Sequence, residues 1–229
     1  MAEVPEGVPE VQFSHTLVYR RTERWLELEA PRAALAAELE AALARTPGVR
    51  VRGVYSVSGL RADADVAVWL LSEDVAAVQA AAAAVRRTAF GRATELTWAF
   101  LGVARPPEYV GDHWAAFQLG KPPLRWLCLY PFVRSPEWYL LPYAERARLL
   151  RDHGALARDF SDVQTNTVQA FGLGDWEWLL HFECDRPERF TALIRRLREA
   201  EARRYVRLET PFVLGRRVDR LEEALEALG

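Results

Sequence analysis

Hydrophobic positions follow strand and helix periodicities in a regular order along the N-terminal half of the chain. The pattern predicts strands over residues 14–21, 49–59, 65–71 and 93–103, and helices over 31–48 and 74–87. The first helix has Pro31 at its start and Gly48 at its end, which are common boundary signals. The order β-α-β-β-α-β is typical of a ferredoxin-like unit.

The C-terminal half repeats this order of elements. Its pattern predicts strands over 124–133, 165–172, 176–183 and 209–215, and helices over 144–158 and 186–204. Element order, turn position and helix placement agree between the halves, so we interpret the sequence as an internal duplication. The last segment, 219–229, reads as a short amphipathic helix or a frayed tail.

The duplication predicts an α+β fold made of two ferredoxin-like halves. Each half provides a four-stranded antiparallel sheet with helices on one face, and the two free faces need burial, which a dimeric α+β barrel with outer helices supplies. The predicted domains are an N-terminal half (10–105), a connecting loop (106–123), a C-terminal half (124–218) and a tail (219–229).

Composition narrows the classes of partner and compartment. The 229 residues include 32 acidic and 30 basic side chains, so no general field favours nucleic acid or an anionic membrane. The N-terminus lacks a signal-peptide pattern and no long apolar run occurs. Cys128 and Cys184 lack metal-ligand spacing. We therefore expect a cytoplasmic protein that neither spans a membrane nor binds nucleic acid.

Four histidines are candidates for chemistry. His15 and His181 lie in strand patterns among few polar neighbours and read as structural. His153 lies on or beside the apolar stripe of its predicted helix, and Gly154 beside it indicates close approach by a flat or bulky group. The pattern alone favours a hydrogen-bonded core histidine over a haem or metal ligand, and leaves the ligand as the alternative.

The strand over 124–134 carries a second constellation. Alternation places Tyr130, Phe132 and Arg134 on one face. An aromatic face that ends in a cation suits a planar ligand with carboxylates, because guanidinium groups bind carboxylates and rings stack on a macrocycle. A packed strand with a solvated arginine at its end explains the pattern equally well. Pro131 indicates an edge, a bulge or a pocket wall.

His113 is the third candidate and lies in the long connecting loop. Loop histidines are usually solvated, but the aromatic neighbours Tyr109, Trp114 and Phe117 are unusual for a linker. Long loops inside compact chains are often functional.

Several of these segments together resemble a known family. They are YPFVRSPEWYLLPYAERARLLRDHGALARDF, NTVQAFGLGDWEW and ETPFVLGRR, with RGVYSVSGLRADADVAVW and EYVGDHWAAF upstream. In this order and spacing they resemble the coproheme decarboxylases of actinobacterial type, within the chlorite dismutase-like family, over about residues 10–217. The resemblance implies the duplicated barrel, haem in the C-terminal half and usually a homopentamer.

The resemblance also implies an activity and roles for residues. The activity is the hydrogen peroxide-dependent oxidative decarboxylation of two propionates of Fe-coproporphyrin III (coproheme), which gives haem b. His153 matches the proximal iron ligand and Tyr130 the tyrosine that is oxidised to a radical. His113 matches a distal base towards peroxide, and Arg134 a basic residue near the propionates. Trp138 and Arg158 match two further pocket residues of the family.

Thr165 departs from the family pattern. Chlorite dismutases carry an arginine there and other coproheme decarboxylases carry glutamine, so the distal pocket here lacks the cation that would hold chlorite. Chlorite dismutase activity is therefore disfavoured, with general peroxidase chemistry as a side activity. The rivals from other classes are a haem carrier or sensor that uses His153 alone, and a non-haem ferredoxin-like assembly protein.

Overall fold

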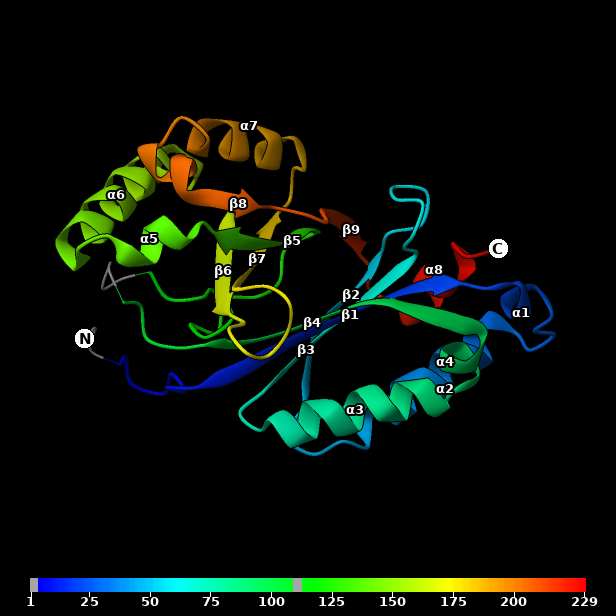
Figure 1. Ribbon diagram of the computed structural model, residues 1–229. Helices are drawn as coiled ribbons and strands as arrows, with labels where there is room; N and C mark the ends of the chain where they lie inside the picture. Colours follow the sequence, from blue (N-terminus) through cyan, green and yellow to red (C-terminus); the bar gives the residue numbers. More distant parts are fainter. Residues whose placement is uncertain (1–3, 109–112) are drawn as a thin grey trace. The chain divides into compact units, whose positions relative to one another are not determined.

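The chain forms two compact units, which we describe separately (Figure 1). A computed structural model describes residues 4–108 and 113–229. The N-terminal unit comprises Gln12–Leu101 and Val213–Gly229, and the C-terminal unit comprises Met1–Val11 and Gly102–Phe212. The domain boundaries expected from the sequence stay a prediction.

Antiparallel strands with helices make up the N-terminal unit. Its strands are β1 (Gln12–Arg21), β2 (Arg50–Ser56), β3 (Val66–Ser72), the first part of β4 (Thr94–Ala104) and β9 (Val213–Arg217). Its helices are α1 (Glu23–Leu26), α2 (Arg32–Ala44), α3 (Val75–Arg87), α4 (Ala89–Ala93) and α8 (Leu221–Glu226). Strand β3 pairs with both β1 and β2, and β2 also pairs with β9.

Apolar side chains from the helices pack on this sheet. All residues of β3 are buried, and α3 contributes Val78, Ala81 and Val85 to the same core. The side chain of Asp74 caps α3 by accepting the backbone N–H of Ala76 at 2.8 Å. Helix α8 buries Leu221, Ala224 and Leu225 in this core, so the end of the chain is a packed helix.

The C-terminal unit has the same kind of architecture. Its strands are β5 (Trp126–Arg134), β6 (Gln164–Gln169), β7 (Trp178–Cys184), β8 (Val206–Leu208) and the end of β4. Its helices are α5 (Pro136–Leu140), α6 (Tyr143–Leu156) and α7 (Glu188–Leu197), with 3-10 turns η1 (Arg158–Phe160) and η2 (Glu201–Tyr205). Strand β7 pairs antiparallel with β5 and with β6.

The strand register fixes which side chains share a face of this sheet. Tyr130 of β5 lies opposite Leu180 of β7, and Leu180 lies opposite Thr167 of β6, so these side chains point to one face. Asn166 and His181 are also paired, and they point to the other face. Helices α6 and α7 cover the face that carries Tyr130 (Figure 1).

Two predicted elements of the C-terminal half are wrong in extent. The helix expected over 186–204 ends as α7 at Leu197, and a separate turn, η2, follows. The strand expected over 209–215 starts only at Val213, as β9, and residues 209–212 form a gap between it and β8, which was not predicted and ends at Leu208. Pro211 lies in the gap and has no backbone N–H to offer to a ladder.

The other predicted strands and helices occur within a few residues of their expected bounds, and the α+β class is confirmed. Within the described ranges, no helix is both long and apolar enough to cross a membrane.

Candidate functional site

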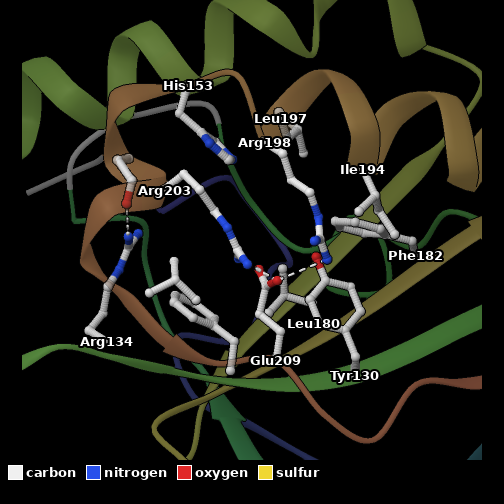
Figure 2. A pocket seen from close by; sticks show the side chains of 13 residues that line it. Tyr130, Arg134, His153, Leu180, Phe182, Ile194, Leu197, Arg198, Arg203 and Glu209 are labelled. Atoms are coloured by element: carbon white, nitrogen blue, oxygen red, sulfur yellow. Dashed lines mark hydrogen bonds and ion pairs between the residues drawn. The ribbon is translucent and has the colours of Figure 1, made fainter.

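An open-mouthed pocket lies in the C-terminal unit between the sheet and the helices (Figure 2). It is lined by residues of β5, α6, β7, α7, η2 and the segment that follows: Tyr130, Phe132, Arg134, His153, Leu180, Phe182, Ile194, Leu197, Arg198, Ala202, Arg203, Val206 and Glu209. Three residues singled out from the sequence, Tyr130, Arg134 and His153, therefore line one cavity.

His153 enters the pocket from the last turn of α6, and Figure 2 shows its imidazole pointing inward. Burial lowers the pKa of His153 to about 4, and electrostatic interactions with Arg134 and His113 add to this effect. The imidazole is therefore neutral near pH 7 and has a nitrogen lone pair for a metal or a hydrogen-bond donor.

Gly154 leaves space beside His153. A Cβ placed on Gly154 would meet no heavy atom within 4 Å among the described residues outside its own helix and chain neighbours. Gly154 does not line the pocket, so its close approach to a bound group stays a prediction.

Tyr130 forms the opposite wall of the pocket. Its ring stacks on Phe212 with centroids 4.4 Å apart and meets the edge of Phe182 at 5.7 Å. Burial is the main reason that the pKa of Tyr130 is raised, so the phenol is protonated at neutral pH. In Figure 2 its hydroxyl end points into the pocket, towards Arg198.

Arg134 is held in place at the end of β5. Its guanidinium carbon lies 4.0 Å from the ring centre of Trp138 and 4.8 Å from that of Phe132. Its Nη1 donates to the carbonyl of Ala202 at 3.1 Å, and its backbone N–H donates to Glu177 at 2.7 Å. Arg134 is thus a positioned cation in the pocket wall, and the solvated strand end is the weaker interpretation.

Three charged residues of the pocket were not singled out from the sequence. Glu209 forms ion pairs with Arg198, at 3.2 Å, and with Arg203. The same three charges also act on Tyr130: Glu209 raises the pKa of its phenol, and the two arginines lower it. The arginine-rich run RRLREAEARR is visible in the sequence, but the break after α7 decides which of its side chains face the pocket.

The other predicted site residues do not line the cavity. Trp138 is buried and packs against Arg134, which does line the cavity. Arg158 is exposed at the start of η1. Thr165 lies on β6 opposite the pocket residue Phe182. His113 is exposed and close enough to affect the pKa of His153, while Tyr109 lies outside the described residues.

Hydrogen bonds to β6 hold the segment that follows His113. The backbone N–H of Phe117 donates to the side chain of Asn166 at 2.9 Å, and that of Ala116 donates to the carbonyl of Thr165 at 3.1 Å. Asn166 in turn donates to the carbonyl of His181 and to Glu183, at 3.0 and 3.1 Å. All three polar residues of this cluster, Asn166, His181 and Glu183, are fully buried.

His15 and His181 lie away from the pocket. His181 is fully buried on the opposite sheet face, and desolvation lowers its pKa to about 3. Burial also lowers the pKa of His15 in β1. In the part of the chain that the structure describes, no cluster of three His, Cys, Asp or Glu side chains could hold a metal ion. A haem iron, by contrast, needs only one axial side chain.

Comparisons with known sequences agree on one family. A family model described as chlorite dismutase matches residues 32–218. The coproheme decarboxylase of Mycolicibacterium smegmatis is 49% identical over 172 residues, which cover 75% of this chain and 74% of that protein. A coproheme decarboxylase of Thermus thermophilus is 28% identical over 187 residues, covering 76% and 74%. The resemblance noted in the motifs is confirmed.

Solved structures support the fold class. The chlorite dismutase of Candidatus Nitrospira defluvii in complex with imidazole superposes with a TM-score of 0.84 at 23% identity, covering 95% of this chain and 94% of that chain. A putative chlorite dismutase superposes with a TM-score of 0.80 at 25% identity, covering 96% and 100%.

Proposed function

Because the chain belongs to the chlorite dismutase family, we propose that it uses hydrogen peroxide to decarboxylate two propionates of ferric coproheme, giving haem b. Each reacting propionate side chain loses carbon dioxide and two hydrogens and becomes a vinyl group. The two hydrogens reduce one peroxide to two waters. Ferric coproheme is therefore both the substrate and the source of redox chemistry.

The observation that carries this proposal is the composition of a single pocket. A neutral imidazole, a protonated buried phenol and three guanidinium groups surround an apolar cavity. Apolar walls suit a porphyrin face, and guanidinium groups suit its carboxylates. A pocket for a small uncharged ligand needs neither the cations nor the imidazole.

His153 fits the role of axial iron ligand. Its depressed pKa keeps the imidazole unprotonated, and its side chain lines the pocket. Arg134 would bind a propionate from the pocket wall, and Trp138 would hold Arg134 in place through their stacked contact. Arg158 and Thr165 would act at the margin of the site.

Tyr130 fits the role of the residue that removes hydrogen from the reacting propionate. Its hydroxyl points into the cavity, and Phe212 fixes the orientation of its ring. His113 would accept the proton of the incoming peroxide, a step for which histidine is suited near neutral pH. Thr165 offers no cation for chlorite, so decarboxylation is favoured over chlorite chemistry.

Assembly and location complete the proposal. By resemblance to its family the chain would form a homopentamer, with iron bound only as part of the macrocycle. The two free cysteines are compatible with the reducing cytoplasm, where coproheme and peroxide would be its small-molecule partners.

One experiment tests this function directly. Purified protein is mixed with ferric coproheme, peroxide is titrated in, and the porphyrins are separated by mass. We expect two successive losses of carbon dioxide and two hydrogens, with close to two peroxides consumed per macrocycle. His153→Ala is the matched variant, and it should weaken coproheme binding or change the ferric spectrum, because the axial imidazole is lost.

Two outcomes would contradict the proposal. Coproheme that binds with a shifted Soret band but keeps its mass after peroxide would indicate a haem carrier. An unaltered spectrum and affinity in His153→Ala would show that His153 is a core residue.

A further inference from the structure

Glu209 places a negative charge in a pocket proposed to bind a polyanion. Its side chain is only 18% exposed, and the cavity is lined by this one carboxylate and by the three arginines Arg134, Arg198 and Arg203. A propionate that entered beside an unmoved Glu209 would meet a like charge in a partly desolvated site, which is unfavourable. This placement needs an explanation.

The partners of Glu209 supply one. Arg198 ends α7, Arg203 lies in η2 and Glu209 follows β8, so three separate segments converge on one ion-pair cluster. Figure 2 shows both guanidinium groups turned towards the carboxylate from the helix side of the pocket. A carboxylate of a macrocycle in this cavity would find the same two donors at the same place.

We propose that Glu209 is an internal substitute for a substrate carboxylate: it pairs with Arg198 and Arg203 until a propionate of coproheme takes its place. This inference rests on the proposed function and adds a residue that sets substrate affinity. Displacement exchanges one carboxylate for another on the same guanidinium groups, so the arginines keep a partner throughout.

The neighbours of Glu209 favour such an exchange. The side chains of Arg198 and Arg203 are 48% and 35% exposed, so their pairs with Glu209 are of the weaker, partly solvated kind that a competing anion can replace. Tyr130 already responds to all three charges, which places the exchange beside the phenol proposed to act on a propionate.

The test is a binding titration with ferric coproheme in the absence of peroxide. Glu209→Gln removes the competing charge and keeps the size of the side chain. We expect it to tighten coproheme binding by roughly 2- to 30-fold, the range for loss of two partly exposed ion pairs. Glu209→Ala should also increase the affinity for coproheme, and it replaces the glutamine variant if that variant misfolds.

Two controls separate exchange from a general change of charge. Glu201→Gln removes the same charge from η2, but Glu201 pairs with Arg148 at 3.0 Å outside the pocket, so binding should stay unchanged. In an Arg198→Met/Arg203→Met background, adding Glu209→Gln should give a clearly smaller gain, because the groups for which the two carboxylates compete are absent and only the repulsion between like charges is relieved.

The outcomes are distinct. Unchanged or weaker binding in both Glu209 variants, or a gain that is just as large without the arginines, would overturn this inference and leave the proposed function intact. Wild-type protein that fails to bind ferric coproheme would overturn the proposed function and this inference with it.

Discussion

Tyr130 shows how a single side chain is prepared by its surroundings. Phe212 and Phe182 pack against its ring, and its phenol oxygen points into the cavity. Burial keeps the phenol protonated, and nearby charges of both signs act on it. Replacement by phenylalanine therefore removes chemistry and leaves packing nearly intact.

The first prediction follows from that separation. Tyr130→Phe should bind ferric coproheme with wild-type affinity and lower the unfolding free energy by no more than about 1.5 kcal/mol, the contribution of one hydrogen bond. It should form haem b at least about 100-fold more slowly, as expected when a group that moves hydrogen is lost. Mass analysis of the porphyrins after peroxide gives the rate.

Tyr139→Phe is the matched control for this variant. Tyr139 is 37% exposed, donates its hydroxyl to Glu177 at 2.6 Å and lies outside the cavity. Normal haem b formation by Tyr130→Phe, with loss of activity in Tyr139→Phe, would move the reactive phenol to Tyr139.

Sequence patterns predict single residues well when they lie on regular elements. Strand alternation placed Tyr130 and Arg134 on one side, and the cavity contains both. Helical spacing placed His153 near the apolar stripe of its helix, and its imidazole is largely buried. Glu209 was missed because the pattern placed it at the start of a strand over 209–215, whereas it lies between β8 and β9, where strand alternation does not set the direction of a side chain.

At the scale of elements, β6 links the pocket to the segment after His113. Asn166 accepts the N–H of Phe117 on the sheet face opposite the pocket, and Thr165 accepts that of Ala116. The loop that brings His113 near the pocket is therefore anchored within four residues of that histidine. We therefore expect the position of His113 to depend on this anchor.

The second prediction concerns Asn166→Ala. It leaves the buried N–H of Phe117 without its acceptor, which should lower the unfolding free energy by about 1 to 3 kcal/mol. If Asn166 acts by positioning His113, peroxide consumption should slow by at least about 10-fold while coproheme affinity is kept. The measurement is the rate of spectral change after peroxide, at fixed coproheme occupancy.

A double variant distinguishes positioning from general damage. His113→Ala alone should slow the peroxide step by roughly 10²- to 10⁴-fold. Adding Asn166→Ala should then have little further effect, because the residue it positions is gone. Independent, multiplying effects would show that Asn166 acts elsewhere.

Elements also mark where prediction from sequence ends. The helix expected over 186–204 has an amphipathic pattern along its length, yet it stops at Leu197. Ala200 is buried and Arg198 and Arg203 reach the pocket from either side of the break. Tertiary packing overrides local helix propensity here, and a single sequence holds no signal for that competition.

At the scale of the whole molecule, buried neutral histidines couple stability to pH. The pKa is lowered to about 3 for His181 and to about 4 for His153, and burial also lowers it for His15. In the unfolded chain each would titrate near 6.5. As the pH falls below about 6.5, these histidines bind protons in the unfolded state but stay neutral in the folded state, so the free energy of unfolding decreases.

The third prediction is the size of that decrease. Denaturant unfolding of the ligand-free protein should show a free energy that falls between pH 6.5 and 5, where most carboxylates stay ionised. His181→Gln should reduce the slope by up to about 1.4 kcal/mol per pH unit, the contribution of one proton. An identical slope in the variant would mean that folded His181 is protonated in this range.

The cavity makes the stability of the C-terminal unit depend on bound ligand. Helix α3 packs Val78, Ala81 and Val85 onto its sheet, whereas the helices of the C-terminal unit bury apolar residues such as Leu149 and Leu193 and also leave a cavity lined by His153 and Arg198. In the C-terminal unit the macrocycle would fill this cavity, and ligand at 100 times its dissociation constant adds about 2.7 kcal/mol of stability. In a cell, supply of coproheme would then set the lifetime of the enzyme as well as its turnover, because molecules without substrate open more often to proteases.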